Sequence, residues 1–256
     1  MADYDILGNI AIIKSEKKSE EQKLKQAQEL LKKPGIKTVL EKATNVHGRL
    51  RTIKTKHILG KKNLIAEHKE NASLFKFNVE TCYFSPRLSN ERQLIAKKIK
   101  PKDKVLVMFA GVGVYPVIIY KYSRPKKIIG VELGKECCKY FKENLEINKV
   151  PEGKIEIIQG DVKKKVNKTL GKFDVVIMAR PNLKETFLKY GLEVSKKGTR
   201  LFYYGFCRDE EINDLVETLK SEANELKRKI KVLDIVPSGE IAPYKHRFRI
   251  EIKVLN

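Results

Sequence analysis

The stretch DKVLVMFAGVGVY, residues 103 to 115, constrains the fold more than any other part of the chain. Its VLVM run is continuously apolar, which is typical of a strand buried on both faces. Gly111 and Gly113 follow directly, and a helical pattern continues over residues 115 to 121. A strand, a glycine turn and a helix frame a nucleotide-binding crevice, because small residues let a ligand approach the backbone. Pro116 replaces the third glycine of GxGxxG, so a plain tight turn explains this loop alone equally well.

Acidic residues end the next two predicted strands. The strand KKIIGVEL ends at Glu132, roughly 20 residues after the glycines, where a carboxylate can accept hydrogen bonds from both ribose hydroxyls. The strand KIEIIQGD ends at Asp161, which predicts an acid beside an adenine. Helix capping is the alternative role of both side chains. A dinucleotide-binding fold and an S-adenosylmethionine-binding fold share this beginning.

The far end of the predicted sheet separates these two folds. A fourth strand over residues 173 to 178 leads into Ala179-Arg180-Pro181-Asn182, and TRLFYYGF forms a fifth. After a long helix over residues 209 to 227, the segments KIKVLDIVP and HRFRIEIKVL form two strands with no helix between them. This order predicts an α/β fold of the class I methyltransferase type, with a Rossmann-like seven-stranded sheet whose last strand is antiparallel.

Residues 1 to 80 are predicted to form a small, basic α+β domain. DILGNIAIIK predicts a hairpin with its turn at Gly8-Asn9, and a charged helix follows within residues 15 to 33. KTVLEKA, the basic segment 47 to 60, and NLIAEHKENASLFKFNVET predict further strands, with a turn near Asn71.

Residues 81 to 102 are predicted to be a linker and a helix, and residues 103 to 256 form the cofactor-binding domain. The linker CYFSPRLSNER combines aromatic, proline, arginine and carboxylate side chains within a short length. Ser89 is the predicted N-cap of the helix, and Glu91 lies in its first turn, where a carboxylate is favourable for the helix dipole.

The charge balance points to a polyanionic partner. Lys and Arg number 54 against 32 Asp and Glu, which leaves a formal net charge of +22. Nucleic acid is the favoured partner. A lysine-rich proteome from a hot or salty habitat is the alternative, but Glu does not rise together with Lys here.

The sequence contains no predicted membrane span or secretory signal, since no apolar run approaches about 18 residues. Its cysteines, Cys82, Cys137, Cys138 and Cys207, have neither zinc-site nor disulfide-framework spacing. We therefore expect reduced thiols, no bound metal and a cytoplasmic location. The sequence does not fix the oligomeric state, and a monomer is the simplest expectation.

Several segments resemble a known enzyme family. They are YDILGNIAII, GRLR at 48 to 51, HKENASLFKFNVETCYFSPRLSNER, MFAGVG at 108 to 113, and IAPYKHRFRIEI. The chain resembles the archaeal and eukaryotic tRNA (guanine-37-N1)-methyltransferases and their wybutosine-pathway relatives. YFSPRL followed by MFAGVG is typical of the methyltransferase branch, whereas the aminocarboxypropyl-transferring branch keeps MFAGxG without SPRL. The resemblance implies S-adenosylmethionine as cofactor and tRNA as partner.

The resemblance also implies roles for individual residues. Glu91 falls on the proposed general base that removes the guanine N1 proton, Arg51 on the arginine that faces O6, and Tyr83 on the aromatic side chain beside the target base. A helix-start acid, a phosphate contact and a core tyrosine are the alternative interpretations. The predicted cofactor contacts are Phe109, Ala110, Gly111, Gly113, Glu132, Asp161, Arg180 and Pro181. The predicted RNA contacts are Arg49, Lys54, Lys56, Arg87 and Asn182.

The chain departs from the family pattern at two places. Ala179-Arg180-Pro181 stands where relatives carry Asn-Leu-Pro, with Asn182 displaced by three positions, and Val107 stands where an acid often precedes the glycine loop. Two alternatives to guanine N1 methylation therefore stay open. One is aminocarboxypropyl transfer from the same cofactor, and the other is RNA binding without catalysis.

Overall fold

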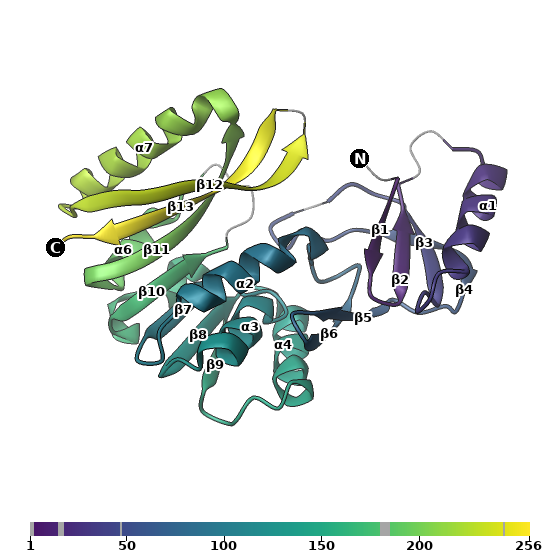
Figure 1. Cartoon of the computed structure of the whole chain (residues 1–256), viewed down its shortest axis with the longest axis horizontal. Coiled ribbons are helices and arrows are strands. Elements are labelled where there is room, and N and C mark those ends of the chain that lie inside the picture. The colour runs from purple at the N-terminus through teal and green to yellow at the C-terminus, as the bar shows by residue number, and fades with distance from the viewer. Residues whose placement is uncertain (1–2, 15–17, 47, 180–184, 243) are drawn as a thin grey trace.

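A seven-stranded sheet forms the larger part of the computed structural model, which describes residues 3–14, 18–46, 48–179, 185–242 and 244–256 (Figure 1). Its strand order is β12-β13-β11-β10-β7-β8-β9. The strands are β7 (Lys104–Met108), β8 (Lys127–Glu132), β9 (Ile155–Gln159), β10 (Phe173–Met178), β11 (Ser195–Arg208), β12 (Ile230–Ala242) and β13 (Lys245–Val254). Strand β13 is antiparallel to both of its neighbours, whereas β7 to β11 are parallel, so the predicted class I methyltransferase fold is confirmed.

Helices cover both faces of this sheet, which explains why its central strands are apolar throughout. On β7, Val105 and Val107 pack in one cluster, and Leu106 and Met108 pack in another. The helices of the first face are α2 (Ser89–Lys98), α3 (Val114–Ser123) and α4 (Lys135–Ile147). Those of the second face are α5 (Val162–Lys165), α6 (Leu188–Glu193) and α7 (Ile212–Glu225). Short 3-10 turns occur at Pro86–Leu88, Lys168–Leu170 and Asp209–Glu211.

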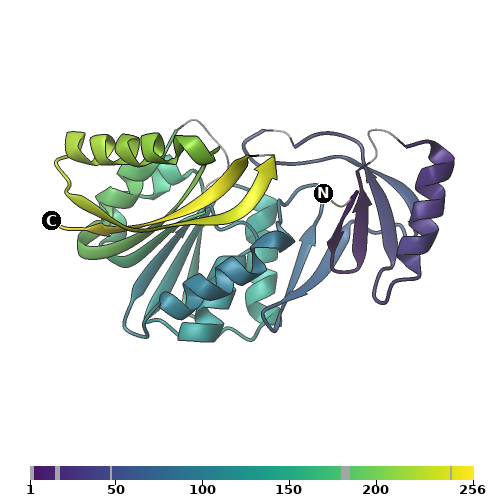
Figure 2. The same cartoon turned by 45° about the horizontal axis from the view of Figure 1, so that its top comes forward.

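A four-stranded sheet and one helix form the N-terminal unit, to one side of the larger sheet (Figure 2). Its elements are β1 (Tyr4–Leu7), β2 (Ile10–Ile13), α1 (Glu20–Leu31), β3 (Thr38–Lys42) and β4 (Thr55–Gly60). The predicted turn at Gly8-Asn9 joins β1 to β2. Helix α1 begins with a capping box at Ser19 and packs Ala27 and Leu30 on the sheet, so the unit has a small core of its own.

The hairpin of β5 (Ile65–Glu70) and β6 (Ser73–Asn78) connects the two units. Asn144 of α4 and Asn148, the C-cap of that helix, bind its edge: Leu74 N donates to Asn148 Oδ1 at 3.0 Å, and Lys76 N donates to Asn144 Oδ1 at 2.8 Å. Glu67 N donates to Asn9 Oδ1 at 2.8 Å on the other side. The predicted domain boundaries after residues 80 and 102 stay a prediction. The hairpin precedes both boundaries, and it contacts Asn9 in the N-terminal unit as well as Asn144 and Asn148 in the larger unit.

Two local expectations differ from the structure. The strand expected over residues 47 to 60 is confined to Thr55–Gly60, because residues 48 to 51 form a turn in which Gly48 and Arg51 have positive φ and Leu50 is 41% exposed. Leu88, not Ser89, is the N-cap of α2, and Ser89 Oγ accepts a hydrogen bond from Asn71 Nδ2 at 3.2 Å.

Within the described part of the chain, no helix is long and apolar enough to cross a membrane.

Candidate active site

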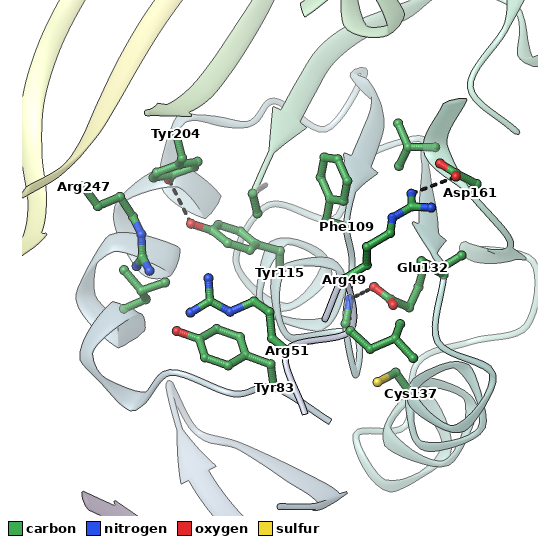
Figure 3. Close-up of a pocket in the computed structure, with 16 residues that line it drawn as sticks. Arg49, Arg51, Tyr83, Phe109, Tyr115, Glu132, Cys137, Asp161, Tyr204 and Arg247 are labelled. Carbon is green, nitrogen blue, oxygen red and sulfur yellow. Dashed lines mark hydrogen bonds and ion pairs between the residues drawn. The ribbon is translucent and has the colours of Figure 1, made fainter. Parts of the chain in front are cut away.

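A cavity of about 140 Å³ opens at the carboxyl ends of β7 to β10 (Figure 3). Parallel sheets bind ligands at this edge, because the loops after neighbouring strands meet there. Arg49, Leu50 and Arg51 of the β3–β4 connection close the cavity from the opposite side. Its lining contains Arg49, Leu50, Arg51, Tyr83, Leu88, Phe109, Gly111, Tyr115, Glu132, Leu133, Cys137, Asp161, Val162, Ala179, Tyr204 and Arg247.

The loop after β7 has a backbone that only particular residues allow. Gly113 has φ +85, and a Cβ there would lie 2.1 Å from the ring of Phe141, so this position requires glycine. Phe109 has φ +61 although it is not glycine. Such strain concentrates at ligand sites. The turn thereby places Phe109 and Gly111 on the cavity wall, whereas Ala110 and Gly113 are in the same turn but do not line the cavity.

Glu132 is a buried carboxylate at the end of β8. Its Oε2 accepts a hydrogen bond from Gly111 N at 2.8 Å, and its Oε1 accepts one from Gly134 N at 2.7 Å. Burial raises the pKa of this carboxyl, although the backbone donors oppose the shift. Each oxygen keeps a second lone pair, so Glu132 can still accept from a ligand hydroxyl.

Asp161, at the end of β9, has the capping role and also pairs with an arginine, whereas its place beside an adenine stays a prediction. It is the N-cap of α5, since its Oδ1 accepts from Lys163 N at 3.0 Å. Its Oδ2 accepts from Arg49 Nη2 at 2.7 Å, across the cavity from the N-terminal unit. Burial raises the pKa of Asp161, but the hydrogen bonds from Arg49 and Lys163 outweigh this and lower it overall. Arg49, predicted to bind RNA, therefore pairs with a predicted cofactor residue.

Arg51 and Tyr83 lie together at the cavity mouth. The guanidinium carbon of Arg51 is 4.0 Å from the centre of the Tyr83 ring, a cation–π contact. Arg51 has φ +57, and its Nε is buried without a hydrogen-bond partner among the described residues. Buried donors are normally satisfied, so an unpaired one at a cavity indicates a ligand acceptor.

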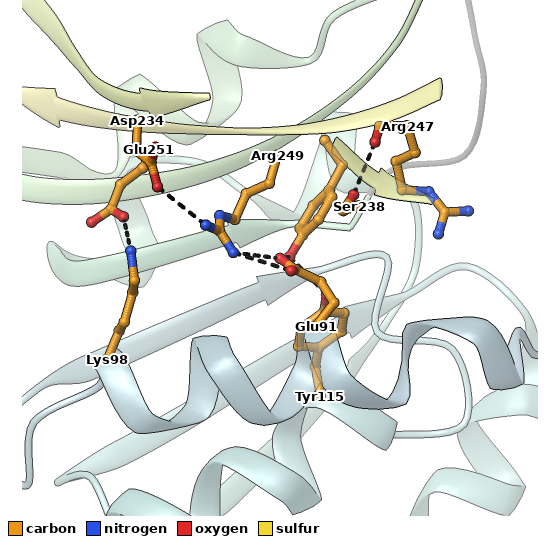
Figure 4. A network of polar contacts seen from close by, with 9 residues as sticks. Glu91, Lys98, Tyr115, Asp234, Ser238, Arg247, Arg249 and Glu251 are labelled. Carbon is orange, nitrogen blue, oxygen red and sulfur yellow. Dashed lines mark hydrogen bonds and ion pairs between the residues drawn. The ribbon is translucent and has the colours of Figure 1, made fainter. Parts of the chain in front are cut away.

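Glu91 is buried and does not line the cavity. Figure 4 shows it facing Arg249. Arg249 Nη1 donates to both Glu91 oxygens at 3.0 Å, and Tyr204 Oη donates to Oε1 at 2.7 Å. Arg249 Nη2 also donates to Asp234 at 3.2 Å. The base role predicted for Glu91 stays a prediction, and Tyr204, which lines the cavity, is hydrogen-bonded to Glu91.

A second cavity of about 740 Å³ adjoins the first and is wider. It lies between the N-terminal unit, the SPRL linker and the β12–β13 hairpin, and it shares Arg51, Tyr83, Leu88 and Arg247 with the first cavity. Arg87 lines it and donates to Asp5 Oδ1 at 3.1 Å. Lys54 and Lys56 lie on the outside of the N-terminal unit, with side chains 77% and 63% exposed, and pair with Glu80 and Glu20.

Seven of the predicted site residues line the first cavity: Arg49, Arg51, Tyr83, Phe109, Gly111, Glu132 and Asp161. Arg180, Pro181 and Asn182 lie outside the described residues. The predictions missed Tyr115, Tyr204, Arg247 and Arg249. The sequence held a signal for the last two, because Arg247 and Arg249 are two positions apart in a predicted strand and therefore lie on the same face of it. Among the described residues, no group of three or more His, Cys, Asp or Glu side chains is arranged to hold a metal ion.

Comparison with known proteins gives close matches along the whole chain. Trm5b of Pyrococcus abyssi, a tRNA (guanine(37)-N(1))-methyltransferase, is 30% identical over 254 residues, which are 98% of this chain and 74% of that protein. Its crystal structure has a TM-score of 0.88 at 28% identity and covers 99% of this chain and 75% of its own.

Two other matches carry further information. Taw22 of Nanoarchaeum equitans, a tRNA (guanine(37)-N(1))/4-demethylwyosine(37)-methyltransferase, is 30% identical and is matched over 98% of this chain and 99% of its own length. The complex structure of aTrm5 and tRNALeu has a TM-score of 0.86 at 27% identity and covers 99% of this chain and 72% of that one.

Family models divide the chain into two parts. The TYW2 N-terminal domain matches residues 1–63, and the TRM5/TYW2 methyltransferase domain matches residues 66–233. The second match spans the glycine loop, both strand-end acids and the YFSPRL linker. The chain therefore belongs to the TRM5/TYW2 methyltransferase family.

Proposed function

We propose that this protein is an S-adenosylmethionine-dependent tRNA methyltransferase that modifies N1 of a guanine at or near position 37 of the anticodon loop. The observation that carries the proposal is the shared cavity, in which Arg51 and Tyr83 face the strand-end acids Glu132 and Asp161. An aromatic ring and an unpaired arginine donor suit a flipped-out guanine. Acids at the strand ends suit an adenosyl group.

S-Adenosylmethionine supplies an electrophilic methyl group on a sulfonium. In our proposal the loop from Phe109 to Gly113 supports the cofactor, Glu132 accepts from the ribose hydroxyls, and Asp161 lies beside the adenine. Arg180 and Pro181 are predicted to complete this site. Arg49 donates to Asp161 Oδ2 in the present geometry, and each oxygen of Asp161 keeps a lone pair that can accept from an adenine amino group.

Replacement of Glu132 by alanine is expected to weaken cofactor binding by about 1.5 to 3 kcal/mol, the usual loss for a hydrogen bond to a charged group. Calorimetry with S-adenosylhomocysteine measures this loss. Because Glu132 also accepts from Gly111 N and Gly134 N, Glu132→Gln is the matched control that keeps one acceptor and the side-chain volume. Unchanged affinity of the alanine variant would rule out the ribose contact.

The same cavity also suits the target guanine, which is the second reactant. Guanine N1 carries a proton and is a poor nucleophile until that proton leaves. We propose that Tyr83 stacks on the base, that Arg51 stabilises the charge that develops on O6, and that Glu91 is the final proton acceptor. The proton must pass from the cavity to Glu91, since that carboxylate is held by Arg249 and Tyr204.

The tRNA is proposed to dock on residues 1 to 80, with the second cavity as the path of the anticodon loop. Arg49 and Arg87, which line the cavities, are predicted contacts together with Asn182, and Lys54 and Lys56 are the predicted phosphate contacts. The proposal also places the protein in the cytoplasm, where a tRNA substrate would be met.

Charge reversal at Lys54 and Lys56 is expected to weaken tRNA binding and reduce its salt dependence by roughly one unit of slope for each lost phosphate contact. Cofactor affinity should not change, because neither side chain lines the cavity. Lys220→Glu on α7, remote from the N-terminal unit, is the matched control (Figure 1). Equal tRNA affinity of the double variant and the wild type at low and high salt would contradict the proposal.

Aminocarboxypropyl transfer is the second candidate function. The match of residues 1–63 to the TYW2 N-terminal domain favours it, whereas the SPRL segment and the relatives Trm5b and Taw22 favour methyl transfer. Cofactor labelled in the methyl group or in the carboxyl group separates the two, because each reaction leaves only one label in the tRNA.

Mass mapping of nucleosides tests the whole proposal. Unmodified tRNA is incubated with protein and cofactor, digested, and mapped by position. We expect N1-methylguanosine at or near position 37. A methyl group on another atom, or no transfer at all, would overturn the proposed function.

A further inference from the structure

We propose that Tyr115 contacts the target guanine and passes its N1 proton through Tyr204 to Glu91. This inference rests on the proposed function and explains how a carboxylate outside the cavity could act on a base inside it. Tyr115 and Tyr204 both line the cavity, whereas Glu91 does not (Figure 3). The three side chains come from α3, β11 and α2, and they form one continuous hydrogen-bonded chain.

The direction of this chain follows from the chemistry of its last member. An ionised carboxylate only accepts hydrogen bonds, so Tyr204 Oη must donate to Glu91 Oε1, at 2.7 Å. Because the single hydroxyl proton of Tyr204 is used in that bond, Tyr115 Oη must donate to Tyr204 Oη, at 2.8 Å. Tyr115 is left with a lone pair, and no described residue donates to its hydroxyl. This lone pair can accept a hydrogen bond from the N1–H group of a guanine in the cavity.

The surroundings keep both tyrosines neutral. Burial raises the pKa of Tyr115 to about 12, and burial raises that of Tyr204 well above its usual value. Neither phenol is therefore an ionised base near neutral pH, and each can take a proton only while it gives one up. The charged and titratable groups around the pair are Glu91 and Arg92 on α2, Arg247 and Arg249 on β13, and Tyr83 and Arg51 at the cavity mouth.

The step balances without any further reactant. The N1–H bond breaks as an O–H bond forms on Tyr115, the original Tyr115 proton moves to Tyr204, and the original Tyr204 proton moves to Glu91. The electron pair left on N1 forms the bond to the methyl carbon, whose bond to sulfur breaks with its electrons remaining on sulfur. Protons move back along the same chain to solvent after the methylated base leaves.

The test is Tyr115→Phe, which removes the relay hydroxyl and keeps the ring. The single-turnover methylation rate should fall at least about tenfold, while tRNA and cofactor affinities stay unchanged. The deficit should shrink as pH rises, because guanine N1 then ionises without help. Tyr120→Phe, on the same helix, is the matched control, since no hydrogen bond of its hydroxyl is found among the described residues.

Two further measurements separate a relay from a structural role. In wild type, the methylation rate plotted against the deuterium fraction of the solvent should be curved, because several protons move in the same step. Tyr115→Phe should lose that curvature. A fluorotyrosine at position 115, which is more acidic, should shift the pH dependence of the rate. A Tyr115→Phe rate equal to wild type, or a loss of equal size at every pH, would overturn the relay. Wild-type protein that forms no N1-methylguanosine would overturn the proposed function and the relay with it.

Discussion

Replacement of Glu91 by glutamine is expected to lower the single-turnover methylation rate by roughly 10²-fold or more. Glutamine keeps the shape of the side chain and can accept from Tyr204, but it cannot take up the N1 proton. Cofactor and tRNA affinities should change little, because the lost interaction belongs to the transition state. The rate of the variant should rise with pH as guanine N1 ionises by itself.

The control for this prediction is Glu136→Gln. Glu136 lies in the first turn of α4, as Glu91 lies in the first turn of α2, so both changes remove a carboxylate from a helix start. If the helix dipole were the only role of Glu91, both variants would methylate at the wild-type rate. The base would then have to be sought elsewhere, with water or Asp161 as candidates. Circular dichroism before the assay verifies that the Glu91→Gln variant is folded.

The fold was predictable because its signals are local. The apolar run of β7 is short and continuous, which indicates a strand buried on both faces, and Val105 and Leu106 indeed pack on opposite sides. Glu132 and Asp161 follow such strands directly, so the sheet edge that gathers them could be inferred from strand order alone. The absence of a helix between the last two predicted strands identified the antiparallel closure.

The side-chain partners of the site were not predictable in this way. Glu91 and Arg249 are 158 positions apart, and their contact exists only once α2 packs across β13. Periodicity assigns Glu91 to a helix start and gives no sign of its burial. The turn that carries Arg51 was predicted as strand because its polar and apolar residues alternate, yet positive φ at Gly48 and Arg51 ends that regularity. These side-chain positions therefore depend on contacts between distant parts of the chain, which a local sequence pattern does not report.

Replacement of Arg249 by methionine is expected to destabilise the fold by about 3 to 5 kcal/mol. Arg249 and Glu91 are 4% and 8% exposed, so removal of the guanidinium leaves a buried carboxylate with Tyr204 as its remaining hydrogen-bond donor among the described residues. Methionine retains most of the apolar stem, which limits the loss of packing. Urea unfolding followed by circular dichroism measures the change in free energy.

A double-mutant cycle tests the physical cause of that loss. Glu91→Gln combined with Arg249→Met leaves no buried charge at the site, so the double variant should recover most of the stability that Arg249→Met loses. Lys253→Met, exposed on the same strand, should stay within about 0.5 kcal/mol of wild type. If the double variant were as unstable as Arg249→Met alone, packing of the arginine stem would account for the loss. Recovery of stability without recovery of methylation would instead separate the two roles of Glu91, because the neutral pair supports the fold while only the carboxylate accepts a proton.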